Sequence, residues 1–161
     1  MAKLEVLRYP NSILRKKCDA IETIDDDVVQ LAQDMLETMY EDKGIGLAAP
    51  QVGITRQLIV LDIGDGPLAL INPKVVEAEG SDIMEEGCLC LPGINMDVER
   101  SERVRVTALD TRGDAVDIDA DDLLARALQH EIDHLSGTLI IDKISKLKRD
   151  LLLKKYKKDQ Q

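Results

Sequence analysis

Apolar residues recur at helical spacing in the first half of the chain, between residues 28 and 43. Three aspartates precede this run at positions 25–27, where negative charge suits the positive end of a helix dipole, and Gly44 follows as a stop signal. Residues 121–135 also form a helical pattern, which carries leucines along neighbouring faces. The pattern therefore predicts two central helices, followed by a basic C-terminal helix at about residues 144–158.

Shorter apolar runs predict β-strands. They lie at residues 57–63, 68–76, 96–98 and 103–109, with a weaker one at 116–118 and a short helix expected at 11–17. The stretch GIGLAAPQVG, residues 44–53, is no phosphate loop, because it lacks GKS or GKT and no strand leads through it into a helix. It predicts a strand edge that another backbone approaches closely. Helices and strands do not alternate regularly, so we expect an α+β fold.

The length of 161 residues suits one compact domain, residues 1–161. The chain has no Phe and no Trp, so Leu, Ile and Val must fill the core. The N-terminus has no signal-peptide core and no apolar run is long enough to cross a membrane. Three cysteines, an odd number, do not indicate a disulfide framework, so we expect a reducing, cytoplasmic location.

Charge is distributed unevenly along the chain. Its net value is −10, but residues 142–161 contain eight Lys or Arg and three Asp, a net charge of +5, which leaves −15 on the rest. Two interpretations of the basic C-terminal segment stay open. It is either a solvated helix of an acidic protein or a docking element for an anionic surface such as RNA.

The stretch QHEIDH, residues 129–134, carries the strongest chemical signal. His130 and His134 are the only histidines of the chain, and on a helix two residues four apart share one face and can grip one ion. Glu131 stands beside the first histidine, where it can reach a metal-bound water and act as a base. The sequence therefore predicts a metal site of the HExxH kind.

Two histidines need a third ligand. The metalloprotease pattern HExxHxxGxxH fails, because position 140 is Ile, and no Glu follows His134. The stretch EEGCLCLPG, residues 85–93, offers Cys88 and Cys90, whose thiolates suit Zn²⁺ or Fe²⁺ beside two histidines.

If Cys88 and Cys90 lie on a strand, both face the same way, and with His130 and His134 they can form a closed Cys₂His₂ structural zinc module without catalysis. An HExxH metallopeptidase is the other alternative. Two observations argue against the closed site. The Cys-x-Cys spacing is shorter than is usual for structural zinc, and a closed site would leave Glu131 without a role.

Three stretches together resemble the peptide deformylases: GIGLAAPQVG (44–53), EGCLCLP (86–92) and QHEIDHLSG (129–137). The N-terminal VLRYPNSILRKKC and the helix segment QDMLETMY (33–40) also fit, so the resemblance spans nearly the whole chain. It implies an α+β fold with antiparallel β-sheets packed around a central helix that carries HExxH, plus a C-terminal helix. The implied activity is metal-dependent removal of the formyl group from the N-terminal formyl-methionine of newly synthesised polypeptides.

The resemblance assigns roles residue by residue. Cys88 becomes the third metal ligand beside His130 and His134, and Glu131 the catalytic acid/base. The Gln51 amide and the Leu89 backbone N–H are expected to bind the reacting carbonyl oxygen. The substrate-binding residues are expected to be Gly44, Ile45, Gly46, Leu123 and Ala127.

The resemblance also bears on the metal and the partners. It implies one divalent ion, Fe²⁺ in the cell, with Zn²⁺, Ni²⁺ or Co²⁺ as substitutes. The expected partners are nascent N-formyl-methionyl polypeptides. The basic C-terminal helix suggests the ribosome and its RNA as a further partner. The family commonly has Ser where this chain has Cys90, so we expect the metal site to be prone to oxidation.

Overall fold

The computed structural model describes residues 3–160, so residues 1–2 and 161 of the predicted domain lie outside it. A large antiparallel sheet has the strand order β1-β2-β3-β6-β7. Its strands are β1 (Gly46–Ala48), β2 (Leu58–Leu61), β3 (Leu68–Glu79), β6 (Arg103–Leu109) and β7 (Ala115–Asp121). The strands β4 (Asp82–Gly87) and β5 (Asn95–Arg100) form a separate antiparallel hairpin.

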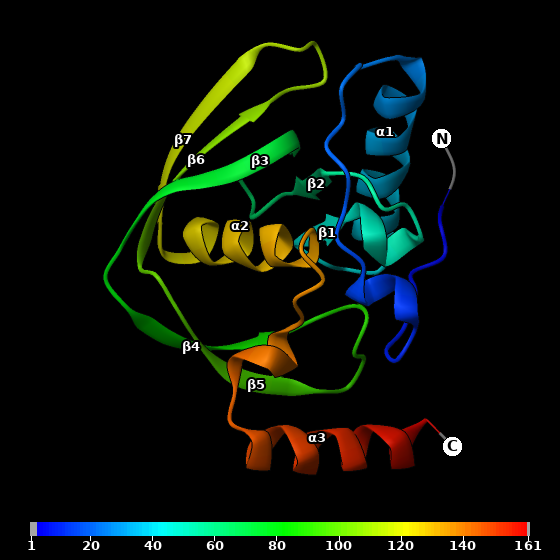
Figure 1. Cartoon of the computed structure of the whole chain (residues 1–161), viewed down its shortest axis with the longest axis vertical. Coiled ribbons are helices and arrows are strands. Elements are labelled where there is room, and N and C mark those ends of the chain that lie inside the picture. Colours follow the sequence, from blue (N-terminus) through cyan, green and yellow to red (C-terminus); the bar gives the residue numbers. More distant parts are fainter. Residues whose placement is uncertain (1–2, 161) are drawn as a thin grey trace.

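Three α-helices surround these sheets: α1 (Asp26–Glu41), α2 (Asp122–His134) and α3 (Lys146–Asp159). Figure 1 shows α2 between the large sheet and the β4–β5 hairpin, with α1 beside β1 and β2 and α3 beyond the hairpin. The α+β fold with antiparallel sheets around a central helix is confirmed. No helix within residues 3–160 is long and apolar enough to cross a membrane.

Aliphatic side chains build the core, as the absence of Phe and Trp requires. Successive residues of β2 point to opposite faces of the sheet. Ile59 and Leu61 pack toward the α2 side, whereas Leu58 and Val60 pack against residues of α1. All four side chains are fully buried, which explains why this strand is a continuous apolar run. The sheet thereby holds α1 and α2 on its two faces.

Local signals placed most elements correctly. The Asp25 side chain caps α1 by accepting a hydrogen bond from the Val28 N–H at 3.0 Å, and β6 has the predicted bounds. The short helix expected at 11–17 is a 3₁₀ helix, Ser12–Arg15. The strands β3, β5 and β7 extend beyond their apolar runs, because ladder pairing continues through exposed residues.

The strand geometry on which the closed zinc site was argued is not present. Cys88 and Cys90 do not lie on a strand, because β4 ends at Gly87 and the chain then turns. The Leu91 N–H donates to the Cys88 carbonyl oxygen at 3.0 Å, which closes a β-turn. The strand β4 itself was not predicted.

Gly137 ends the α2 region at a point where no other residue fits. Its φ of +78° is in the left-handed region, and a Cβ added there would lie 2.7 Å from the carbonyl carbon of Arg15. The neighbouring backbone is also bonded across this contact, since the Cys18 N–H donates to the Leu135 carbonyl oxygen at 2.8 Å. The N-terminal segment therefore packs directly on the end of α2.

We expect Gly137→Ala to lower the free energy of unfolding by about 3 kcal/mol or more, since left-handed strain and a backbone clash act together. Gly113→Ala is the matched control, because Gly113 has a similar φ of +85° but the nearest atom to its Cβ position is 3.9 Å away. We expect this control to lose about 1 kcal/mol. Urea unfolding measures both, and equal losses would contradict the close contact with Arg15.

Candidate metal centre

Two separate segments bring three metal-ligating side chains together. His130 and His134 lie one turn apart on α2, and Cys88 comes from the turn after β4. One ligand atom from each lies within 4.8 Å of the other two, and Cys88 Sγ is 3.4 Å from His134 Nε2. Ligand atoms around one tetrahedral ion are separated by roughly 3.3–3.6 Å, so this donor set fits a divalent metal.

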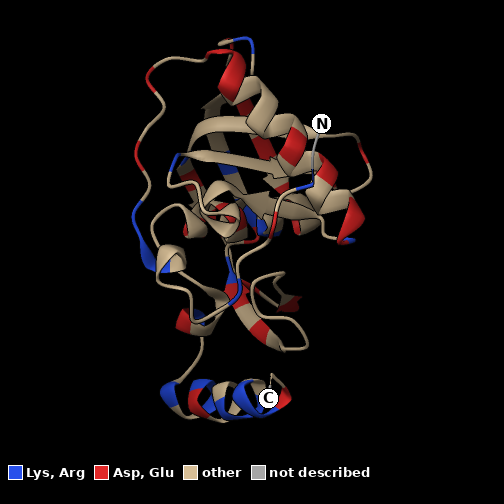
Figure 2. Cartoon of the chain, turned by 90° about the vertical axis from the view of Figure 1, so that its right-hand side faces the viewer, with Lys and Arg blue, Asp and Glu red and all other residues tan. Residues whose placement is uncertain are grey.

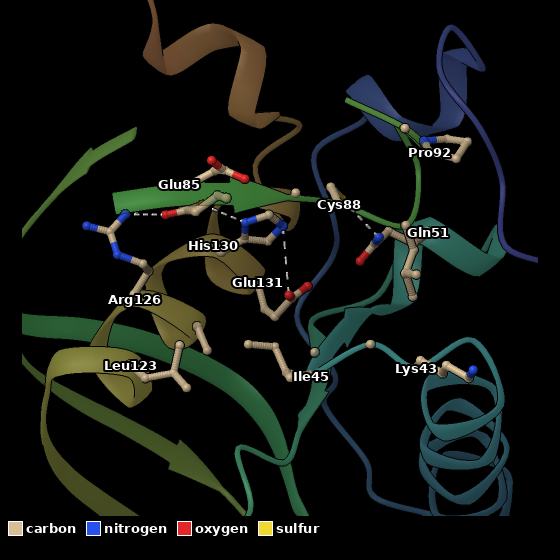
Figure 3. Close-up of a pocket in the computed structure, with 17 residues that line it drawn as sticks. Lys43, Ile45, Gln51, Glu85, Cys88, Pro92, Leu123, Arg126, His130 and Glu131 are labelled. Carbon is tan, nitrogen blue, oxygen red and sulfur yellow. Dashed lines mark hydrogen bonds and ion pairs between the residues drawn. The ribbon is translucent and has the colours of Figure 1, made fainter. Parts of the chain in front are cut away.

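The orientation of His130 also fits a metal ligand. Its Nδ1 lies 2.9 Å from Glu86 Oε1, so this nitrogen carries the proton that the carboxylate accepts. The other nitrogen, Nε2, is thereby left with a lone pair on the side of Glu131, whose Oε2 is 3.9 Å away (Figure 3). A carboxylate behind a ligating histidine fixes its ring and raises its basicity.

Glu86 is the centre of a buried ion cluster that sequence reasoning missed. Its carboxylate accepts hydrogen bonds from Arg100 Nε at 2.6 Å and Nη2 at 2.9 Å, and from Arg126 Nη1. Arg100 also contacts Asp133 at 2.8 Å, so the charges within the cluster balance. Burial acts to raise the pKa of Glu86, but the hydrogen bonds from His130 and Arg100 outweigh it and lower the pKa to about 2.

The cluster joins α2 to the β4–β5 hairpin. Arg126, on α2, donates to the carbonyl oxygens of Val98 at 2.9 Å and Asp82 at 2.8 Å, one on each strand of the hairpin. A sequence signal was available, because Arg126 stands four residues before His130 and therefore on the same face of the predicted helix as this candidate ligand. A buried arginine there requires an acidic partner.

Glu131 lies in the same cavity and is almost fully buried. Its Oε1 has no hydrogen-bond partner among the described residues, and burial raises its pKa to about 7. Gly46 of β1 packs directly on it: a Cβ at Gly46 would lie 2.9 Å from the Glu131 carboxyl carbon. The missing side chain at Gly46 therefore makes room for the carboxylate.

Gln51 presents its amide nitrogen to the metal-binding side chains. The Ala48 N–H donates to Gln51 Oε1 at 2.8 Å, which pins the amide and turns Nε2 toward Cys88 Sγ at 3.5 Å (Figure 3). The side-chain amide of Gln51 therefore reaches the ligating side chains from the 3₁₀ helix Ala49–Val52, which follows β1. A donor held in this way needs no reorganisation to meet a developing negative charge.

A cavity of about 450 Å³ contains nearly all the residues that the sequence singled out. His134 is buried behind the cavity wall instead. The predicted site residues in the lining are Gly44, Ile45, Gly46, Gln51, Cys88, Leu89, Leu123, Ala127, His130 and Glu131. Ile45 and Leu123 keep 46% and 40% of their surfaces exposed, so the cavity has an apolar mouth.

The closed Cys₂His₂ arrangement has no support in the geometry. Within residues 3–160, the only group of at least three ligating side chains is Cys88, His130 and His134, without Cys90. The Cys90 side chain is fully buried in an apolar cluster with Leu14 and Ile140. Two of the three ligating side chains, Cys88 and His130, line the cavity, so a fourth position on a metal ion held there would be open to it.

We expect Glu86→Gln to lower the free energy of unfolding by about 3 kcal/mol, because two buried arginines lose their carboxylate. Metal affinity should fall about 10- to 100-fold through the loosened His130 ring. Glu85→Gln is the matched control, since the Glu85 side chain is exposed. Urea unfolding and competition with a chromophoric chelator measure the two effects. A Glu86→Gln protein that behaves like the control would remove the cluster from both roles.

Comparisons with known proteins agree with this geometry. A model of the polypeptide deformylase family matches residues 3–150. A peptide deformylase of Thermodesulfovibrio yellowstonii is 51% identical over 98% of each chain. One of Clostridium botulinum is 51% identical over 91% of this chain and 99% of its own length.

Two crystal structures extend the likeness to three dimensions. A peptide deformylase from Legionella pneumophila has a TM-score of 0.95 at 41% identity, covering 99% of this chain and 96% of that chain. One from Ehrlichia chaffeensis, in complex with actinonin, has a TM-score of 0.95 at 37% identity, covering 99% and 98%. Fold, matched motifs and identity agree, and the chain belongs to the polypeptide deformylase family.

Proposed function

We propose that the cavity beside α2 hydrolyses the formyl amide of N-formyl-methionyl peptides, releasing formate and a free amine. The observation that carries this proposal is the convergence of Cys88, His130 and His134 with the buried Glu131 beside a cavity that has an apolar mouth. Membership of the family supports the same reaction. Neither the closed zinc module nor the metallopeptidase is favoured.

Cys88, His130 and His134 would hold one divalent metal ion. When bound, the ion supplies a Lewis acid that activates water and polarises a carbonyl oxygen. We take Fe²⁺ as the ion in the cell because the family resemblance implies it. One thiolate and two imidazoles also accept Zn²⁺, Ni²⁺ and Co²⁺.

Glu131 acts as the base and then as the acid. Its carboxylate takes a proton from the attacking water while the water oxygen adds to the formyl carbon. The same proton then passes from Glu131 to the amide nitrogen as the C–N bond breaks, since an amine anion is a very poor leaving group. The buried, unpartnered Oε1 of Glu131 supports this role, because no protein donor competes for it among the described residues.

The negative charge on the formyl oxygen is met by two fixed donors, the Gln51 Nε2 and the Leu89 backbone N–H. The bond from the Ala48 N–H to Gln51 Oε1 supports this assignment, because it leaves Nε2 free to turn toward the reacting atoms. Removal of one such donor costs roughly 10²- to 10³-fold in rate.

The peptide part of the substrate would add a strand to β1. This strand is at the edge of the large sheet and pairs only with β2, through Gly46 and Leu61 at one end. An extended peptide can therefore pair with the open edge along residues 44–47. The methionine side chain would enter between Ile45, Leu123 and Ala127, whose partly exposed apolar surfaces suit a flexible thioether.

The first test measures formate release from a formyl-Met-Ala-Ser peptide by anaerobically purified protein loaded with Fe²⁺ or Ni²⁺. We expect formate from this peptide and no acetate from its acetylated counterpart. Glu131→Gln should retain one metal per chain, measured by elemental analysis, and lose at least about 10³-fold in kcat. Glu22→Gln, at an exposed side chain that does not line the cavity, serves as the control. No formate from fully loaded protein would refute the proposed function, and near-normal turnover of Glu131→Gln would refute only the role of Glu131.

We further propose that α3 contacts ribosomal RNA, which places the reaction in the cytoplasm where nascent chains emerge. Figure 2 shows α3 at one end of the molecule, with Lys and Arg along most of its length. The helix is attached through Tyr156, which is buried and donates to the Tyr9 carbonyl oxygen at 2.9 Å. The basic residues are Lys146, Lys148, Arg149, Lys154, Lys155, Lys157 and Lys158.

We expect substitution of Lys155, Lys157 and Lys158 by Gln to weaken ribosome binding and to reduce the slope of log Kd against log salt by about 2. Deleting α3 is a poorer test, because it also removes Tyr156 from the core. The control replaces three exposed lysines elsewhere, Lys16, Lys17 and Lys74. Equal binding and equal salt dependence in all three proteins, measured by co-sedimentation, would exclude α3 as the contact.

A further inference from the structure

Two sulfur atoms lie side by side at the edge of the metal centre. Cys88 Sγ and Cys90 Sγ are 3.2 Å apart, although both cysteines are free. The third cysteine, Cys18, belongs to a different core cluster, between the large sheet and α2. Cys90 has no role in the proposed reaction. Its position beside a metal ligand therefore needs another explanation.

The turn after β4 allows these sulfurs to bond. Cys88 and Cys90 occupy the first and third positions of the turn closed by the Leu91 N–H. A turn brings such positions closer together than a strand does, within the range of Cα separations that a disulfide accepts. The sulfurs need to approach by about 1.2 Å to reach the S–S bond length. The Tyr9 N–H, which donates to the Cys90 carbonyl oxygen at 2.8 Å, holds the backbone of the turn in place.

The two cysteines differ in access. Cys88 lines the cavity, so a small oxidant that enters meets its sulfur first. Cys90 is fully buried behind it, among Leu91 and Ile94. This is the arrangement of an attacked cysteine and a resolving cysteine, in which the second thiol intercepts the first oxidation product.

We propose that Cys88 and Cys90 form a reversible disulfide when the site meets hydrogen peroxide. The Cys88 sulfur takes one oxygen atom from the peroxide, which leaves as water, and becomes a sulfenic acid. The Cys90 sulfur then attacks the Cys88 sulfur and expels that oxygen as a second water. In total, two thiols lose two hydrogen atoms and one peroxide becomes two waters.

This disulfide changes what oxidation does to the site. A disulfide sulfur is no thiolate ligand, so the metal ion would be released. The irreversible sulfinic and sulfonic acids are avoided, because the Cys88 sulfur is already bonded. Cys90 therefore protects the ligand that it neighbours, contrary to the expectation that a spare thiol makes the site more vulnerable. The disulfide rests on the sulfur geometry, and only the release of metal rests on the proposed function.

The experiment treats the full-length, Ni²⁺-loaded protein with one equivalent of hydrogen peroxide, since Fe²⁺ would itself reduce the peroxide. Free thiols are then alkylated, and mass spectrometry of the digested chain locates each modification. We expect the wild type to lose two hydrogen atoms between Cys88 and Cys90, to keep Cys18 alkylated and to release metal to a chromophoric chelator. Dithiothreitol should restore both thiols and metal binding.

The matched variant is Cys90→Ser, with Cys90→Ala as a second in case the serine is poorly tolerated in an apolar cluster. Either should retain metal before oxidation. Under excess hydrogen peroxide, since a sulfinic acid takes two equivalents and a sulfonic acid three, either should accumulate these acids at Cys88 roughly tenfold faster than the wild type. Cys18→Ala should behave like the wild type. Equal over-oxidation with and without Cys90, or a disulfide through Cys18 or between chains, would overturn the proposal. A disulfide that forms without metal release would support the proposed disulfide and would contradict the role of Cys88 as a metal ligand.

Discussion

The burial of Glu86 between two arginines and a histidine is the constraint on which the site depends. A carboxylate in a protein interior is tolerated only when ionic and hydrogen-bonding partners surround it. Here the partners come from separate elements: Arg100 from β5, and Arg126 and His130 from α2. One interaction therefore attaches the hairpin to the helix and also turns a histidine nitrogen toward the other two candidate metal ligands. Structural cohesion and ligand orientation cannot be altered independently.

The same cluster explains where sequence analysis succeeded and where it failed. The spacing of apolar residues and the capping residues predict α1, α2 and β6. The three candidate ligands were predicted from the spacing of the histidines and from the family resemblance. Strand β4 has the reverse of the usual pattern, since Ile83 and Met84 are 62% and 41% exposed while Glu86 is buried. The burial of Glu86 on this strand depends on Arg100 and Arg126, which lie far along the chain. A rule based on the local sequence therefore does not predict β4.

Two of the candidate site residues lie on irregular segments, which the neighbouring strands hold in place. The turn after β4 carries Cys88, and the 3₁₀ helix after β1 carries Gln51, each tied down by backbone hydrogen bonds. Their backbone conformations could not be derived from periodicity, which is why the sequence left open how Cys88 and Cys90 lie relative to each other. The turn keeps the two sulfurs side by side but leaves Cys90 outside the group of three side chains that could hold a metal.

The contact between Gly46 and Glu131 has a consequence for substrate selection. The edge of β1 offers only backbone groups, so it reads the direction and extension of a peptide and not its side chains. Because no side chain separates that edge from the carboxylate, the strand that aligns the peptide also sets the distance from its first amide to the proton carrier. In the proposed reaction, such an arrangement would measure length from the chain end, so that one catalyst could serve polypeptides of every sequence that begin alike.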